Sequence, residues 1–348
     1  MFLLDPRSLE PVPRRPRTDD SGDDAQEDSV EAEMYAAQVE TSTEPASTAD
    51  ELHDRLVRAR RTAARTAAHV GADLMASSTA VVGAATELTD DDRYREMVVR
   101  HGPVARQAAV CGMHVHVEVG SDHEAVRVVD AIAPWLPVVA AVSAASPYAQ
   151  GDDTGFASWR AHCWDQWPTA GAVEPFGDVA TYRSAVDALV ASGAAHDDAM
   201  VYFDARLGRG LPTVEIRVCD VQPDLADAVT LAVLLRALVT TAAERSTPRP
   251  RTETLRAARW LARRDGVDRE LLHPIHGRPV PASDAVQELL DHCEPALREA
   301  GDAAHVEREV TRMAAGGGAP GRLRAVASGD AFALAQHLVS RTTAALDG

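Results

Sequence analysis

Three stretches of the chain, residues 111–119, 201–206 and 213–219, alternate between apolar and polar residues with a period of two. Because successive side chains of a strand point to opposite faces, each stretch predicts a strand with one apolar and one charged face. The charged faces carry His114, His116 and Glu118, then Tyr202, Asp204 and Arg206, then Glu215 and Arg217. This alternation is typical of antiparallel sheets, so we predict a mostly antiparallel sheet with a core side and a charged working side. The working side is the candidate active site.

Apolar residues at helical spacing predict helices around these strands. The expected helices cover residues 49–71, 89–109, 121–133, 136–145, 178–193 and 223–243, with three or four more between 252 and 346, broken at 272–281 and 316–318. Residues 1–4 and 72–77 are expected to be short strands. The segment 33–43 leaves two interpretations open: a short strand that presents Glu40 to the working side, or a solvated surface carboxylate. The chain as a whole predicts an α+β fold.

The length allows one large domain or two ordinary ones. We expect a single domain over residues 1–348, with 10–32 as a mobile loop and 252–346 as its helical C-terminal part. Apolar residues make up 45% and charged residues 25% of the chain, as in soluble proteins. A net charge of −18 argues against nucleic-acid binding. The sequence has no run of about 18 apolar residues, so no membrane association is expected. The four cysteines form no CxxC pair, which favours a reducing cytoplasm.

All 35 basic residues are arginine, because the sequence contains no lysine. This excludes a P-loop lysine, a Schiff-base lysine and a lysine adenylate. Any phosphate bound here must therefore be held by arginine, metal ions and backbone amides.

Two chemistries fit the working side. His114 and His116 have a familiar metal-ligand spacing, with Glu118 as a third possible ligand. A zinc hydrolase also needs a further ligand and a general base, for which Asp204 and Glu215 are the candidates. Carboxylates for Mg²⁺ and arginines for phosphate oxygens instead suit ATP-dependent activation of a carboxylate. The loop 143–160, rich in hydroxyl groups and glycine, is either a ligand-binding loop or a turn.

Six ordered motifs together resemble the glutamate–cysteine ligase type-two family of bacterial carboxylate–amine ligases. They are Cys-Gly-Met-His-Val-His-Val (111–117), Trp-Leu-Pro (135–137), Ser-Ala-Ala-Ser-Pro (143–147), Gly-Asp-Asp-Thr-Gly-Phe-Ala-Ser-Trp-Arg (151–160), Asp-Ala-Arg (204–206) and Pro-Thr-Val-Glu-Ile-Arg-Val-Cys-Asp (212–220). The resemblance implies a glutamine-synthetase-like fold, in which a curved antiparallel sheet cradles ATP, Mg²⁺ and the amino acid, with helices outside. It also implies that γ-glutamylcysteine forms in the cytoplasm from glutamate, cysteine and ATP, through a γ-glutamyl phosphate.

The resemblance also implies roles for residues. Metal ligands are expected to be Glu40, Glu215 and His116. Nucleotide contacts are expected from His114, His116, Ser146 and Thr154. Phosphate or substrate carboxylate is expected to be held by Arg160, Arg206 and Arg217, with Asp204 orienting a neighbouring arginine or a metal-bound water.

One departure matters for activity. The family usually has a Gly-Val-Glu-Glu-Glu strand before the Leu-Leu-Asp-Pro turn, and those glutamates belong to its metal site. The chain as written opens at Met1-Phe2-Leu3-Leu4, so we expect either an upstream coding segment or a reduced metal site. The alternatives left open are a catalytically impaired homologue that binds a nucleotide or amino acid, and a ligase with another amine acceptor. The sequence also leaves open whether the protein is a homo-oligomer.

Overall fold

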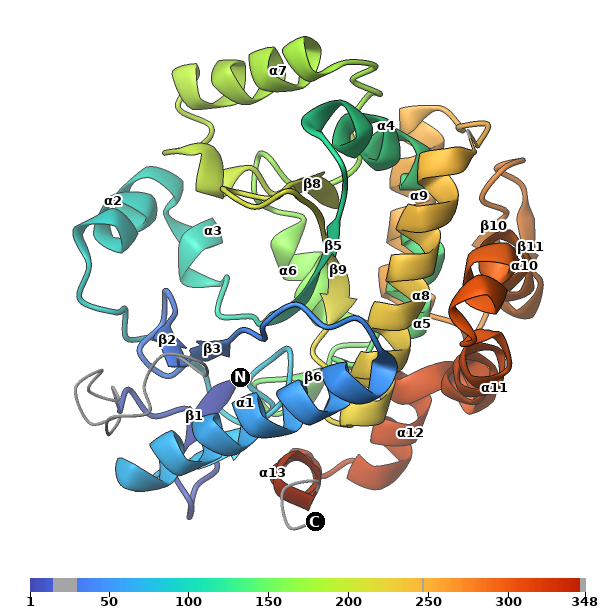
Figure 1. The fold of residues 1–348 in the computed structure, drawn as a ribbon. Helices are drawn as coiled ribbons and strands as arrows, with labels where there is room; N and C mark the ends of the chain where they lie inside the picture. Colours follow the sequence, from blue (N-terminus) through green and yellow to red (C-terminus); the bar gives the residue numbers. More distant parts are fainter. Residues whose placement is uncertain (15–29, 246, 345–348) are drawn as a thin grey trace.

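The computed structural model describes residues 1–14, 30–245 and 247–344. It is a mixed α+β structure in which helices surround small antiparallel sheets (Figure 1). The strands are β1 (Phe2–Leu4), β2 (Val30–Ala32), β3 (Val39–Thr41), β4 (Asp73–Met75), β5 (Gly112–Glu118), β6 (Tyr148–Ala149), β7 (Asp152–Asp153), β8 (Ala205–Leu207), β9 (Thr213–Asp220), β10 (Glu270–Leu272) and β11 (Pro279–Pro281). The helices are α1 (Ala49–His69), α2 (Asp92–His101), α3 (Pro103–Arg106), α4 (Asp122–Ile132), α5 (Leu136–Ser143), α6 (Trp159–Trp164), α7 (Val179–Ala191), α8 (Leu225–Glu244), α9 (Thr252–Asp265), α10 (Ala282–Ala300), α11 (Ala303–Ala314), α12 (Gly318–Ala327) and α13 (Ala331–Ala344), with 3-10 turns η1 (Asp198–Met200) and η2 (Ala315–Gly317).

The three alternating stretches form one antiparallel sheet in the order β5-β9-β8. Val214 and Ile216 of β9 are fully buried in the core, so the predicted apolar face is confirmed. The strand β8 is shorter than predicted, because the chain before Ala205 is irregular and leaves Tyr202 and Asp204 outside the ladder.

The N-terminal strands pair in twos. β1 pairs with β4, β2 pairs with β3, and a bridge between Phe2 and Gln38 connects the two pairs. The expected strands at 1–4 and 72–77 are confirmed, and so is a short strand that contains Glu40. Every paired strand in the described part of the chain is antiparallel, but the pairing gives several small sheets.

The expected loop at 10–32 is described only at its ends. Residues 10–14 form no helix or strand and make a single bridge, between Pro11 and Leu4. Residues 15–29 lie outside the described residues. At the C-terminal end the prediction is wrong, because Val30–Ala32 forms β2 and pairs with β3, with Glu31 opposite Glu40. Three residues are too short a pattern to reveal a strand, since its formation depends on the partner strand with which it pairs.

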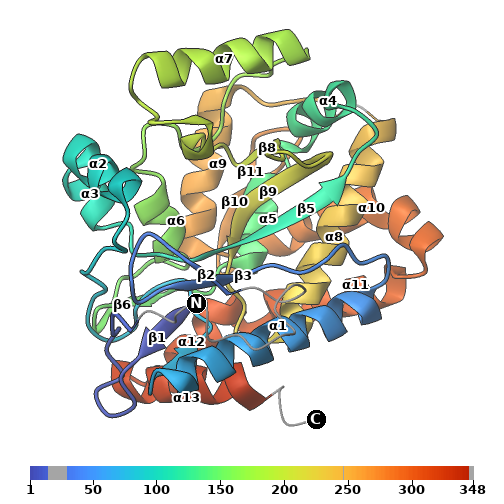
Figure 2. The same cartoon turned by 60° about the vertical axis from the view of Figure 1, so that its left-hand side comes forward.

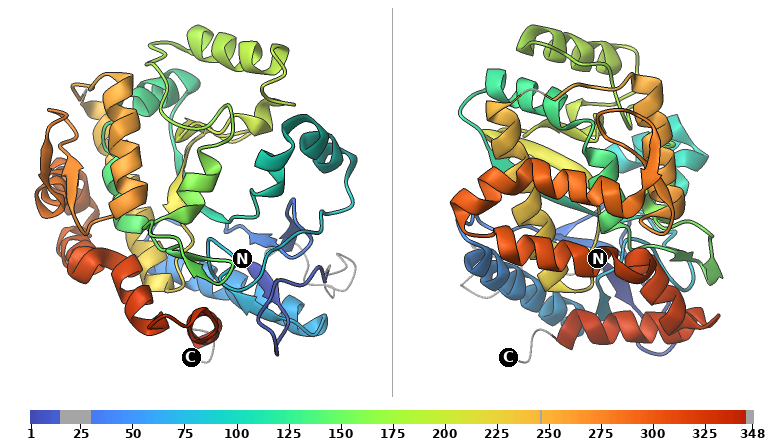
Figure 3. Two further views of the ribbon diagram at one scale, coloured as in Figure 1. Left: turned by 180° about the vertical axis from the view of Figure 1, so that it is seen from behind. Right: turned by 90° about the vertical axis from the view of Figure 1, so that its right-hand side faces the viewer.

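Helix α8 lies at the centre of the molecule, beside the sheet (Figure 2). By length and composition it is apolar enough to cross a membrane, but most of it is buried inside the protein, as expected of a core helix. Leu231, Leu234 and Leu235 have no exposed surface. Helices α4 and α5 also pack against the sheet, and α10 and α11 lie outside α8 (Figure 3).

The other predicted helices are confirmed with two differences. The helix expected at 89–109 breaks into α2 and α3 at Gly102, which adopts a φ of +56° ahead of Pro103. Both residues are typical helix breakers. Within residues 252–344 the chain forms five α-helices, one more than the largest number expected, although it is interrupted by β10–β11 and near 316–318 as predicted.

Candidate active site

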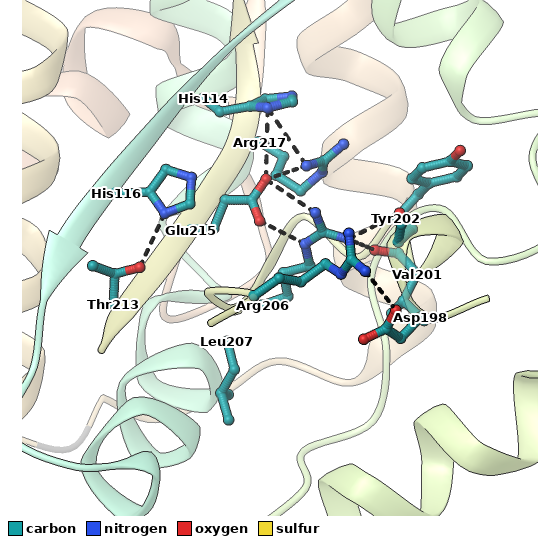
Figure 4. A network of polar contacts seen from close by, with 12 residues as sticks. His114, His116, Asp198, Val201, Tyr202, Arg206, Leu207, Thr213, Glu215 and Arg217 are labelled. Carbon is teal, nitrogen blue, oxygen red and sulfur yellow. Dashed lines mark hydrogen bonds and ion pairs between the residues drawn. The ribbon is translucent and has the colours of Figure 1, made fainter. Parts of the chain in front are cut away.

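One row of side chains crosses the charged face of the three-stranded sheet. Glu215 on β9 lies opposite His116 on β5 and opposite Arg206 on β8 in the strand register. Figure 4 shows the three side chains together with His114 and Arg217. The prediction that these residues share the working side of the sheet is therefore confirmed.

Glu215 is buried and held by two guanidinium groups. Arg206 donates from Nε to Oε2 at 2.6 Å and from Nη2 to Oε1 at 3.3 Å, and Arg217 Nη1 donates to Oε1. Burial alone raises the pKa of a carboxyl group, but Arg217 and Arg206 outweigh it, so the pKa of Glu215 lies below its ordinary value. Glu215 is therefore ionised at neutral pH and orders both arginines.

The two arginines differ in whether their N–H donors have hydrogen-bond partners. Arg206 Nη1 donates to the carbonyls of Ala199 and Val201, so both ends of its guanidinium are used inside the protein. Arg217 is also buried, but its Nε has no hydrogen-bond partner among the described residues. Its guanidinium lies 5.8 Å from the centre of the Tyr202 ring. Because a buried donor without a partner is costly, Arg217 is the better candidate to receive an anionic ligand.

The two histidines of β5 have different environments. His114 Nδ1 lies 3.5 Å from both Glu215 Oε1 and Arg217 Nη1. Burial, and then the positive charge of Arg217, hold the pKa of His114 well below 6.5, so its ring is neutral at pH 7. His116 is exposed, and its Nδ1 lies 2.9 Å from Thr213 Oγ1. Burial also lowers the pKa of His116, so both imidazoles are neutral at pH 7.

Glu40 on β3 forms a carboxyl pair with Glu33. Loss of hydration and the nearby charge of Glu33, to which Glu40 is hydrogen-bonded, raise the pKa of Glu40 to about 8. The residue keeps exposed surface, so this pair is accessible although protein surrounds the carboxyl group. Glu33 was not predicted, because only the β2–β3 fold brings it beside Glu40 and the sequence carries no periodic signal for that contact.

The expected metal ligands do not come together as one set. Among residues 1–14, 30–245 and 247–344, no group of three or more His, Cys, Asp or Glu residues is arranged to hold a metal ion. The zinc-hydrolase alternative therefore gains no support. Assignment of Glu40, Glu215 and His116 as metal ligands stays a prediction, and the ion pairs of Glu215 with two arginines compete with such a role.

Asp204 comes just before β8 and forms its ion pair outside the Glu215 cluster. Its carboxylate pairs with Arg259 of α9 at 2.7 Å, and both residues line a cavity of about 20 Å³ next to α4 and α5. Arg259 also pairs with Asp165 at 2.5 Å. The predicted orientation of an arginine by Asp204 thus has an observed partner in Arg259, whereas its contact with a metal-bound water stays a prediction.

The three remaining predicted residues have partners inside the protein. Ser146 Oγ donates to Asp220 Oδ2 at 2.7 Å and is buried. Thr154 Oγ1 donates to the Pro147 carbonyl at 2.9 Å. Arg160 donates to the backbone carbonyls of β9 and is buried. These contacts brace the loop 143–160 and α6, so the turn interpretation of this loop accounts for its hydroxyl groups.

Comparison with solved structures defines the class of fold. The crystal structure of a glutamate–cysteine ligase from Francisella tularensis in complex with AMP matches with a TM-score of 0.66 and 12% identity, over 99% of this chain and 91% of that one. A bifunctional glutathione synthetase from Pasteurella multocida matches with a TM-score of 0.67 and 16% identity, over 90% of this chain and 48% of that one. The fold is therefore of the glutamate–cysteine ligase and glutathione synthetase type.

Sequence comparison gives the family. The model of glutamate–cysteine ligase family 2 matches residues 1–331, and the chain belongs to this family of ATP-dependent carboxylate–amine ligases, as its motifs predicted. A relative from Nocardioides sp. with the provisional name glutamate–cysteine ligase 2-1 is 47% identical over 75% of this chain and 70% of its own length. One from Streptomyces coelicolor, provisionally named glutamate–cysteine ligase 2, is 43% identical over 70% of this chain and 69% of its own length. The chain thus spans about two thirds of these curated relatives.

Proposed function

We propose that this chain joins the γ-carboxyl group of glutamate to an amine at the expense of ATP, with cysteine as the acceptor. The observation that supports this proposal most is Arg217. Its buried guanidinium has an unpaired Nε, stands beside an ionised glutamate, and lies on a sheet face that also carries two neutral histidines. A site with a buried cation and a spare donor favours an anion such as a phosphoryl group.

The carboxyl pair of Glu33 and Glu40 fits a magnesium ion. Two carboxyl groups held together so closely that one keeps a proton to about pH 8 offer oxygen ligands that a divalent cation would stabilise. Mg²⁺ typically takes one or two carboxylates and completes its shell with water and substrate phosphates. Bound there, it would neutralise charge on the triphosphate, and the exposed ring of His116 is the candidate for a further contact.

The proposed reaction needs little covalent chemistry from the protein. A γ-carboxylate oxygen of glutamate attacks the γ-phosphorus of ATP, and ADP leaves. The amine nitrogen then attacks the carbonyl carbon of the acyl phosphate, loses one proton, and releases phosphate that carries the former carboxylate oxygen. Arg217 orients the transferring phosphoryl group, and Glu215 with Arg206 keeps Arg217 in place.

The finer description of the fold and setting is also part of the proposal. We infer that the β4-β1-β3-β2 pairing and the β5-β9-β8 sheet together form the curved surface of a glutamine-synthetase-like site. The apolar core cluster of the sheet extends to α10 and α11, and a second cluster joins β1 and β4 with α12 and α13, which supports a single domain over residues 1–348. All four cysteines are free and buried, which suits a cytoplasmic protein.

The test is release of ADP by the purified chain with ATP, Mg²⁺, glutamate and a panel of amines that includes cysteine. ADP release should require both glutamate and an amine. Arg217→Met should lower kcat/KM by about 100-fold or more, because a charge that stabilises the transition state is lost. Arg183→Met is the matched control, since Arg183 of α7 is an exposed arginine paired with the exposed Asp122 at the start of α4. ADP release without glutamate, or equal activity of the Arg217 and Arg183 variants, would refute the proposal.

A further inference from the structure

The β9 strand contains an irregularity next to Arg217. Met113 pairs with Cys219 and Val115 pairs with Ile216, so one residue of β5, His114, stands opposite two residues of β9, Arg217 and Val218. Such a bulge disrupts the ladder and turns side chains away from the regular alternation. Cys219 shows the effect: continued alternation would place it on the charged face with Arg217, yet it is fully buried in the core.

The carbonyls of the bulge are satisfied by a buried side chain. Arg160 Nη2 donates to the Arg217 carbonyl at 2.8 Å, and Nη1 donates to the Val218 carbonyl at 3.2 Å. Arg160 is 3% exposed, so these bonds are shielded from water. Because a guanidinium is a rigid fork, one side chain fixes the spacing of the two carbonyls.

Asp220 fastens the segment that carries Arg160 to the same strand. Its carboxylate accepts hydrogen bonds from the Ala145 amide at 2.9 Å, from Ser146 Oγ at 2.7 Å and from Ser158 Oγ at 2.8 Å. Ser158 is also the N-cap of α6, the helix that contains Arg160. Asp220 partly compensates the buried charge of Arg160, so the loop, the helix and the bulge form one connected unit.

Gly112 leaves the room that Arg160 needs. A Cβ atom built on Gly112 would lie 2.9 Å from Arg160 Cζ and closer still to Nη2, which is too close for real atoms. The φ angle of Gly112 is outside the left-handed region, so alanine is compatible with its backbone. Alanine at this position would therefore displace the guanidinium without removing it.

We propose that Arg160 is a positioning residue for Arg217. It acts through the two carbonyls of the bulge, and its guanidinium fits there because Gly112 has no side chain. The effect expected on catalysis rests on the proposed function, whereas the effect on the backbone of β9 does not. In this role Arg160 acts through the backbone of β9 and not on the substrate. It fixes the backbone from which Arg217 projects, so its loss misplaces the Arg217 guanidinium relative to Glu215 and His114.

The test uses the full chain with the variants Arg160→Met, Gly112→Ala, the two combined, and Arg217→Met with and without Arg160→Met. Arg160→Met should lower kcat/KM by about 100-fold, the size expected for a misplacement of about 1 Å. It should have little further effect in the Arg217→Met background, because both changes remove the same interaction. Gly112→Ala should act in the same direction but add nothing to Arg160→Met. If Arg160→Met acted only through a general loss of stability, its effect on kcat/KM would instead add to that of Arg217→Met.

Amide hydrogen exchange over residues 214–220 gives a readout that does not need activity. Exchange there should be faster in Gly112→Ala and Arg160→Met and unchanged in Arg183→Met. Unchanged exchange in Gly112→Ala, or full additivity of Arg160→Met with Arg217→Met, would overturn the inference. Wild-type protein that releases no ADP with any amine would overturn the proposed function, while the exchange data still decide whether Arg160 holds the bulge.

Discussion

His116 and Glu215 lie directly opposite each other on neighbouring antiparallel strands, and Arg206 continues the same row on the third strand. Glu215 is buried at the centre of this row, whereas His116 is exposed at its edge. The row therefore runs from a charged interior to an accessible imidazole. This gradient is what a site needs if it is to hold an anion firmly while its ligand still enters from solvent.

The ion pair between Arg206 and Glu215 should be structural. Arg206→Met leaves Glu215 with one guanidinium and the carbonyls of Ala199 and Val201 without their donor. We expect a loss of about 3–5 kcal/mol in the free energy of unfolding, the cost of removing one partner of a buried pair. Urea unfolding measures this loss, provided that the dependence of the free energy on urea concentration is the same in both proteins. A loss under about 1 kcal/mol would contradict the assignment.

Binding of Mg²⁺ should release a proton through Glu40. Because the pKa of Glu40 is raised to about 8, the carboxyl group is mostly protonated at pH 7 and must ionise to bind a cation. Calorimetric titration of Mg²⁺ in two buffers of different ionisation enthalpy counts that proton. Glu40→Gln should abolish the release, whereas Glu44→Gln, at a nearby exposed glutamate, should retain it. Equal proton release from both variants would show that Glu40 is not a ligand.

His114 should make stability fall on the acid side of neutrality. Its folded pKa lies well below 6.5, so between pH 6.5 and the folded value the unfolded chain binds a proton that the folded protein does not. The free energy of unfolding should therefore decrease as the pH falls through this range. Comparison of urea unfolding at about pH 7.5 and about pH 5.5 tests it. His114→Asn should show a smaller decrease than wild type, and an identical decrease would contradict a neutral, partly buried His114.

Because α8 lies at the centre of the molecule, a cavity made there should strongly lower the free energy of unfolding. Leu235 has no exposed surface, so Leu235→Ala should lower the free energy of unfolding by about 2–5 kcal/mol. Leu211→Ala is the matched control, because Leu211 is 55% exposed and its truncation should cost about 0.5 kcal/mol or less. Similar costs for the two variants, measured by urea unfolding, would mean that α8 is not in the core.

Period-two and period-3.6 patterns predicted the sheet and most helices because those patterns report which face is buried. They could not predict the β9 bulge, since one extra residue leaves no mark on the composition of residues 213–220. Arg160 shows the consequence. The structure shows it bound to backbone carbonyls of β9, but a buried arginine that binds backbone and an arginine that binds phosphate look the same in sequence. Glu33 was missed for a related reason, because its partner Glu40 comes from a separate strand.

The most direct test of the account follows the oxygen atoms of the substrate. Glutamate labelled with ¹⁸O in its γ-carboxylate should be incubated with the chain, ATP, Mg²⁺ and cysteine, and the released phosphate analysed by mass spectrometry. Activation of the carboxylate as an acyl phosphate predicts that one ¹⁸O atom passes to each phosphate formed. Phosphate without label, released at the same rate as ADP, would contradict the central claim.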